Sequence, residues 1–212
     1  LVICEWPDGK HKPVFPIPYS EEAMNGFEYA AACLMIQEGL IDEGLEVVKA
    51  VRDRYDGEKR NPWNEFECGS NYARSMASYA LLLALSGFEF DMVKGYVAFN
   101  PVLVENGRFR SFWCLGEGWG TLDIKPDRVS MKVVYGELKI SAMKFPFLRG
   151  RGLESISIGK EHLEFENANG KISLRSPALI GEGQELVIRA SKRPRTHRNY
   201  EHMITSKSKR IC

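Results

Sequence analysis

The sequence lacks paired cysteines, a marked excess of either charge and long apolar runs. Its five cysteines stand singly without a CxxC pair, and their odd number argues against a complete disulfide framework. The 29 basic and 28 acidic residues leave a net charge of +1, which favours neither nucleic acid nor an anionic membrane. No apolar run approaches the roughly 18 residues of a transmembrane helix. We therefore expect a soluble, cytoplasmic protein with a neutral partner and without nucleic acid.

Signals for metals and phosphate cofactors are also missing. The four histidines are dispersed and include no HExxH motif, and no glycine-rich phosphate loop is present. We expect no metal site and no cofactor. The sequence begins with Leu1 in a proline-rich passage, which suggests that a longer chain preceded it.

The sequence contains 44% hydrophobic and 11% aromatic residues, which is enough to form a buried core. Residues 1–95 show helical periodicity after an extended, proline-rich segment 1–19. The first predicted helix starts at an N-cap, Ser20, and stops at Gly39, with an apolar stripe formed by Met24, Phe27, Ala31, Leu34 and Met35. A second helix is expected from Asp42 to Gly57, forming a hairpin with the first. The third spans 71–86 and is apolar nearly all round, which predicts burial between other helices.

The character changes to β-strand in residues 96–191. Apolar and polar residues alternate at Val129, Met131, Val133 and Tyr135, and an Asn169-Gly170 pair predicts a tight hairpin turn. Residues 192–212 are basic and polar, and we expect a disordered tail. The prediction is an α+β protein with a helical part, an antiparallel β-rich part and a tail.

The most informative segment is the loop 60–74, RNPWNEFECGSNYAR, which leads into the third helix. A carboxylate can accept paired hydrogen bonds from vicinal hydroxyls, an arginine can donate to the same oxygens, and an indole offers an apolar platform for a sugar ring. Loops on a rigid scaffold often carry binding groups. The candidate substrate-binding residues are Trp63, Asn64, Glu65, Glu67 and Arg74.

A structural role explains the same residues. Glu65 or Glu67 could stabilise the N-terminus of the third helix, Arg74 could hold the loop by an ion pair, and Trp63 could fill the core. Physical chemistry alone favours the structural interpretation, because ion pairs at helix entries are common and functional sites are few.

The string NPWNEFECGSNYARSMASYALL, with NGFEYAAACLMIQEGLIDEGLEVVKAVRDRYDG upstream, closely resembles the C-terminal end of the catalytic domain of glycoside hydrolase family 116, the non-lysosomal glucosylceramidase-like β-glucosidases. The resemblance is strong over residues 5 to about 90. Residues 96–190, with FWCLGEGWG, look like the β-rich C-terminal extension of bacterial and archaeal relatives.

The resemblance implies that residues 20–90 are the last helices of an (α/α) barrel of six hairpins, which three helices cannot close. It also implies that Glu65 and Arg74 contact hydroxyls of the bound glucose. The family's nucleophile and acid/base lie upstream of this chain, so we assign no catalytic residue. We do not assign Glu65 or Glu67 as the nucleophile or the acid/base, because retaining glycosidases need two opposed carboxyl groups about 5–5.5 Å apart.

The leading hypothesis is a C-terminal fragment of a retaining β-glucosidase-like hydrolase, inactive alone, with a β-glucoside as substrate and the missing N-terminal part of the same enzyme as partner. The alternative is a stand-alone, non-catalytic carbohydrate-binding or interaction module.

Trp113 and Trp119 could form a second sugar platform, with the nearby glycines letting a ligand approach the backbone. Core packing is the favoured explanation of these tryptophans, because buried aromatic side chains dominate the cores of β-rich proteins.

Overall fold

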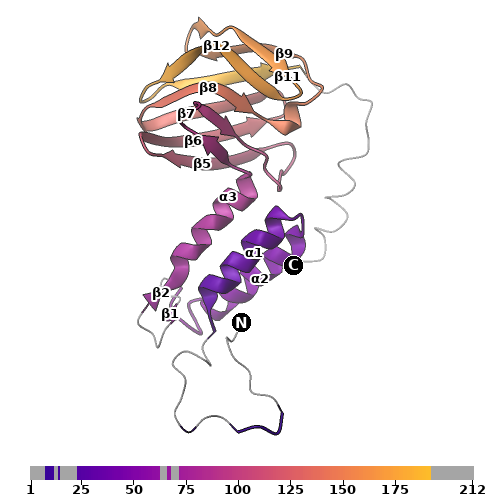
Figure 1. Ribbon diagram of the computed structural model, residues 1–212, viewed down its shortest axis with the longest axis vertical. Coiled ribbons are helices and arrows are strands. Elements are labelled where there is room, and N and C mark those ends of the chain that lie inside the picture. The colour runs from indigo at the N-terminus through magenta and orange to yellow at the C-terminus, as the bar shows by residue number, and fades with distance from the viewer. Residues whose placement is uncertain (1–7, 12–13, 15–22, 63–65, 68–71, 192–212) are drawn as a thin grey trace. The chain divides into compact units, whose positions relative to one another are not determined.

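The structure is a computed structural model that describes residues 8–11, 14, 23–62, 66–67 and 72–191 (Figure 1). Within this part, the side chains of residues 66–67 and 72–75 are not described. The predicted tail 192–212 and most of the entry segment 1–19 lie outside the described residues. The chain forms two compact units, Leu1–Phe90 with Ala98–Val104 and Asp91–Val97 with Glu105–Cys212.

The first unit contains a helical hairpin, as predicted. Helix α1 (Asn25–Gln37) is followed by α2 (Ile41–Arg54), with Gly39 at a φ of +86° in the turn between them. The helices approach closely at Gly44, where an added Cβ would lie 2.7 Å from Cγ1 of Ile36. Glycine is therefore needed at this position for the packing of α1 against α2.

The predicted start of the first helix is wrong, and its predicted buried stripe is confirmed only in part, at Met24, which is 4% exposed. Helix α1 begins at Asn25, with Met24 in the N-cap position and no side-chain cap, rather than at Ser20. Its buried face carries Tyr29, Ala32 and Ile36. The predicted stripe residues Phe27 and Leu34 are 60% and 59% exposed.

The third helix also differs from the prediction. Residues 72–73 form a short strand, so the helical segment begins as the 3-10 helix η1 (Arg74–Tyr79) and continues as α3 (Ala80–Ser86). Pairing of the backbone at residues 72–73 excludes a helix start at residue 71. Leu82 and Leu83 are 40% and 47% exposed, so α3 is not buried all round.

The second part of the chain is built from β-strands, most of them paired antiparallel, which confirms the predicted change to β-structure. Three short strands precede it: β1 (Phe66–Glu67), β2 (Tyr72–Ala73) and β3 (Glu89–Asp91). The others are β4 (Tyr96–Ala98), β5 (Phe109–Leu115), β6 (Gly118–Lys125), β7 (Arg128–Gly136), β8 (Leu138–Lys144), β9 (Leu153–Ile158), β10 (Glu161–His162), β11 (Phe165–Ala168), β12 (Lys171–Ile180) and β13 (Glu185–Ala190), with a 3-10 turn η2 (Pro146–Leu148).

Two larger sheets result, in the orders β10-β9-β13-β7-β6-β5 and β11-β12-β8-β4-β3. Each has one face of buried apolar side chains, such as Leu122 and Met131 in the first and Ile140 and Ile180 in the second. The predicted turn is confirmed: Ala168 pairs with Lys171, and Asn169 and Gly170 have φ values of +54° and +83°. Positive φ at both central residues is typical of a type I′ hairpin.

The alternation predicted for residues 129–135 holds only in part. Val129, Met131 and Val133 are buried, but Tyr135 is 63% exposed. A register shift between Trp119 and Gly120 makes Tyr135, rather than Val134, the partner of Trp119. The extra residue of a β-bulge moves every later side chain to the other face of the sheet.

The described residues are thus an α+β arrangement of three helical segments followed by two sheets, and these helices form no barrel. Within this part of the chain, no helix has the length and apolar character needed to cross a bilayer.

Candidate functional site

Three of the predicted substrate-binding residues, Trp63, Asn64 and Glu65, lie outside the described residues. For Glu67 and Arg74 the structure describes the backbone, in β1 and at the start of η1, but not the side chains. Their sugar-binding roles therefore stay predictions. Cys68, in the same loop, also lies outside the described residues.

The backbone of the loop is nevertheless informative. Strands β1 and β2 pair antiparallel, with Phe66 opposite Ala73 and Glu67 opposite Tyr72. Phe66 follows Glu65 in the sequence and Ala73 precedes Arg74. The two main candidates, Glu65 and Arg74, are thus the sequence neighbours of one backbone pair.

The entry to the loop is fixed by Asp56 after the end of α2. Its Oδ1 accepts hydrogen bonds from the backbone N–H groups of Glu58 at 3.0 Å and Lys59 at 2.8 Å, and its Oδ2 accepts one from Nζ of Lys59 at 2.6 Å. These hydrogen bonds, led by the one from the Lys59 ammonium, lower the pKa of Asp56 from 3.8 to about 2. An ionised carboxylate of this kind stabilises the turn from which residues 60–62 continue.

Basic side chains hold the next residues of the loop. Arg52 of α2 reaches the backbone carbonyl of Pro62, with nitrogen–oxygen distances of 3.4 and 3.5 Å. The guanidinium carbon of Arg60 lies 5.8 Å from the ring centroid of Tyr55, within the range of a cation–π contact. The beginning of the loop is thus tied to the C-terminal end of α2.

Beneath this end of α2 lies a polar cluster that the sequence did not predict. Arg54 pairs with Glu28 and donates from Nη2 to Oδ1 of Asn25 at 2.9 Å, while Nδ2 of Asn25 donates to the hydroxyl of Tyr55 at 2.9 Å. Asn25 is fully buried and Tyr55 is 3% exposed. The Arg54 side chain is thus held in a partly buried ion pair, at 28% exposure, rather than on a fully solvated helix face. One sequence feature could have indicated this cluster: Asn25 and Glu28 are three residues apart, which places both on one side of α1.

The two tryptophans of FWCLGEGWG have different environments. Trp113 is 1% exposed and lies against Gly120, where an added Cβ would be 2.7 Å from the ring atom Cζ2. Trp119 is 43% exposed. The core prediction is thus correct for Trp113 only. Two of the three glycines in this motif are required by the packing. An added Cβ would lie 2.7 Å from the carbonyl oxygen of Glu137 at Gly118 and 1.8 Å from that of Lys132 at Gly120, whereas nothing lies within 4 Å of one at Gly116.

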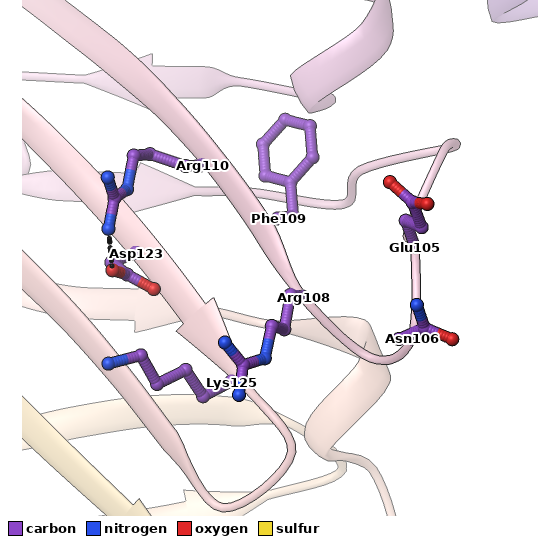
Figure 2. Close-up of a pocket in the computed structure, with 7 residues that line it drawn as sticks. All are labelled: Glu105, Asn106, Arg108, Phe109, Arg110, Asp123 and Lys125. Atoms are coloured by element: carbon purple, nitrogen blue, oxygen red, sulfur yellow. Dashed lines mark hydrogen bonds and ion pairs between the residues drawn. The ribbon is translucent and has the colours of Figure 1, made fainter.

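An open pocket of about 700 Å³ lies where β5 and β6 meet the turn that precedes β5 (Figure 2). Arg110 of β5 pairs with Asp123 of β6 at 2.8 Å within it. The lining residues are Glu105, Asn106, Arg108, Phe109, Arg110, Asp123 and Lys125. The lining is rich in charged side chains and can hydrogen-bond a polar ligand. Among the residues with described positions, no group of histidine, cysteine, aspartate and glutamate side chains suits a metal ion.

Comparisons with known proteins give a limited result. No family model matches this sequence, and no curated protein matches it. Among solved structures, the chain is similar to a GH127 β-L-arabinofuranosidase from Geobacillus stearothermophilus T6, with 14% identity and a TM-score of 0.28. The match covers 58% of this chain and 19% of that protein, so the chain spans about a fifth of its length. The chain thus has a distant, partial structural similarity to a glycoside hydrolase, and the family suggested by the loop motif is not confirmed.

Proposed function

We propose that this chain is the C-terminal part of a retaining β-glucosidase-like glycoside hydrolase, in which the loop 60–74 forms one wall of the sugar subsite. The observation that carries the proposal is the motif NPWNEFECGSNYARSMASYALL and its resemblance to family 116. The pairing of Phe66 with Ala73 is consistent with it, because these residues are the sequence neighbours of Glu65 and Arg74.

In this proposal the chain recognises hydroxyls and does no covalent chemistry. The Glu65 carboxylate accepts hydrogen bonds from two neighbouring hydroxyls of a glucosyl unit, and Arg74 donates to the hydroxyl oxygens. Trp63, Asn64 and Glu67 complete the same wall. The nucleophile and the acid/base belong to a part of the enzyme upstream of residue 1.

The exposed apolar side chains of the helices support the proposal that further helical hairpins pack against this chain in the larger enzyme. Phe27 and Leu34 are seven residues apart on α1, which places them on the same side of that helix, and each is about 60% exposed. Met76 and Tyr79 of η1 are 72% and 70% exposed. Adjacent hairpins of a helical barrel would cover side chains of this kind.

The proposal includes a cytoplasmic location, which rests on the unpaired pattern of the cysteines. Cys33 and Cys114 carry free thiols. A count of reactive thiols in the denatured protein isolated without reductant tests this part. Five thiols per chain are expected, and three or fewer would contradict it.

The proposal is tested by steady-state kinetics on an aryl β-glucoside, using the chain extended through its upstream reading frame. Glu65→Gln should lower kcat/KM about 10- to 100-fold, chiefly through KM, because a hydrogen-bonded charge is lost from the substrate site. Glu58→Gln, which changes an exposed carboxylate just before the loop motif, is the matched control. Equal kinetics for all three proteins would reject the assignment of Glu65.

A further inference from the structure

The outward face of β5, β6 and β7 carries aromatic side chains that the proposed function does not use. Phe112 is 49% exposed, Trp119 is 43% exposed and Tyr135 is 63% exposed. Residues on the opposite face of these strands, such as Trp113 and Leu122, are buried. Aromatic side chains usually lie in the core, and three of them together on a solvent-facing surface are typical of a binding site.

The strand register arranges this face in three rows. Cα partners across β5, β6 and β7 define a first row of Cys114, Trp119 and Tyr135, a second of Phe112, Thr121 and Lys132, and a third of Arg110, Asp123 and Ser130. Ser130, at the β7 end of the third row, is buried. Directly opposite residues on an antiparallel sheet have Cβ atoms about 4.5–5.5 Å apart, and diagonal neighbours remain within reach of aromatic rings. The first two rows therefore form one aromatic surface, here called the aromatic platform, made of Phe112, Trp119 and Tyr135.

The bulge in β7 is what completes the platform. Without the register shift beside Trp119, the regular alternation would place Tyr135 on the buried face with Val133. Gly120 permits the arrangement on the other side of the sheet, since Trp113 fills the space where its Cβ would be. Bulges often redirect a side chain next to a functional site.

Polar groups continue the face beyond the platform. The hydroxyl of Thr121 and the ammonium of Lys132 lie in the second row, and the Arg110–Asp123 ion pair lies in the third. That ion pair also lines the pocket of Figure 2, so the polar end of this face adjoins the pocket. An apolar helix on this face would desolvate these charges without partners, which is costly. Nucleic acid is disfavoured because both signs of charge are present.

We propose that this surface binds an extended β-1,4-linked oligosaccharide. The C–H faces of its pyranose rings lie on the aromatic platform, and its hydroxyls hydrogen-bond to Thr121, Lys132 and the Arg110–Asp123 pair. A β-1,4-linked chain is straight and presents flat ring faces, which suits the extended face of a sheet, whereas α-1,4-linked chains coil. The proposal involves no residue of the loop 60–74 and does not depend on the proposed hydrolase function.

Isothermal titration of the full 212-residue chain tests the proposal, with cellohexaose and xylohexaose as probes and maltohexaose as the coiled counterpart. At least one β-linked probe should bind, more tightly than maltohexaose. Trp119→Ala should weaken its binding about tenfold. Trp119→Phe, which keeps a ring, should retain most of the affinity. Leu179→Ala, which removes an exposed apolar side chain from β12 of the other sheet, should have no effect.

Protection of Cys114 gives an independent readout, because this exposed thiol is the direct Cα partner of Trp119. Bound oligosaccharide should slow alkylation of Cys114, measured at the peptide level by mass spectrometry. Absence of binding by both β-linked probes, or equal binding by the wild type and Trp119→Ala, would overturn the proposal. Self-association that is lost in Trp119→Ala, without sugar binding, would identify the face as a contact between copies of the chain and overturn it as well.

Discussion

Trp119 and Tyr135 are direct Cα partners on the outer face of β6 and β7, because the ladder shifts by one residue beside Trp119. The sequence alternation of β7 instead placed Tyr135 in the core with Val133. The shift therefore places Tyr135 beside Trp119 on the solvent-facing side of the sheet. Trp113 is buried on one side of the sheet, while Trp119 and Tyr135 face solvent on the other.

Gly120 should be essential for this geometry. A Cβ at this position would lie 1.8 Å from the carbonyl oxygen of Lys132 and 2.7 Å from Trp113. We expect Gly120→Ala to destabilise the protein by about 2–3 kcal/mol, measured by urea unfolding. Gly116→Ala is the matched control, since nothing lies within 4 Å of an added Cβ there. It should change stability by less than about 0.5 kcal/mol. Similar unfolding midpoints for the two variants would contradict the described packing.

The Arg54 cluster should contribute strongly to the stability of the helical unit. Arg54→Met keeps much of the side-chain volume but removes the guanidinium that pairs with Glu28 and donates to Asn25. We expect a loss of about 2–3 kcal/mol in the free energy of unfolding, because the pair is largely buried. Lys49→Met removes an exposed ion pair with Asp53 and should cost less than about 0.5 kcal/mol. The interpretation fails if both variants unfold alike.

Asp56 should titrate well below an ordinary aspartate. Its folded-state pKa is about 2 against 3.8, so the stabilisation from its contacts with Lys59 is fully present above about pH 4. That stabilisation is lost as the pH falls from 3.8 through about 2. Carboxyl NMR titration should report the low pKa, and Lys59→Met should raise it toward 3.8. A wild-type midpoint near 3.8 would rule out the described turn.

The exposed apolar face of α1 should make the isolated chain associate. Replacing both Phe27 and Leu34 by serine should lower binding of a hydrophobic dye and reduce light scattering, with little effect on stability. Leu179→Ser, at an exposed position of β12, serves as the comparison. If the double variant binds as much dye as the wild type, the helices do not present an uncovered face.

Local signals predicted several parts of this fold. The second helix followed from its helical periodicity, and the turn at Asn169-Gly170 followed from its residue types. These features depend on short-range periodicity and on the positive φ that the turn requires.

Features that depend on distant partners were missed. Helical periodicity predicted that Phe27 and Leu34 belong to a buried stripe. It does not show which apolar side of α1 packs against α2 and α3. The bulge in β7 depends on its pairing with β6, and the Arg54 cluster joins residues about 29 positions apart in the chain. For the loop, the resemblance supplied the candidate residues Glu65 and Arg74, and their contact with a sugar stays a prediction.

The central claim is that this chain completes the sugar subsite of a larger β-glucosidase-like enzyme. The most direct measurement compares turnover of an aryl β-glucoside by the 212-residue chain and by the same chain extended through its upstream reading frame. We predict turnover by the extended protein and none by the 212-residue chain. Turnover by the 212-residue chain alone, or inactivity of the folded extended protein, would contradict the claim.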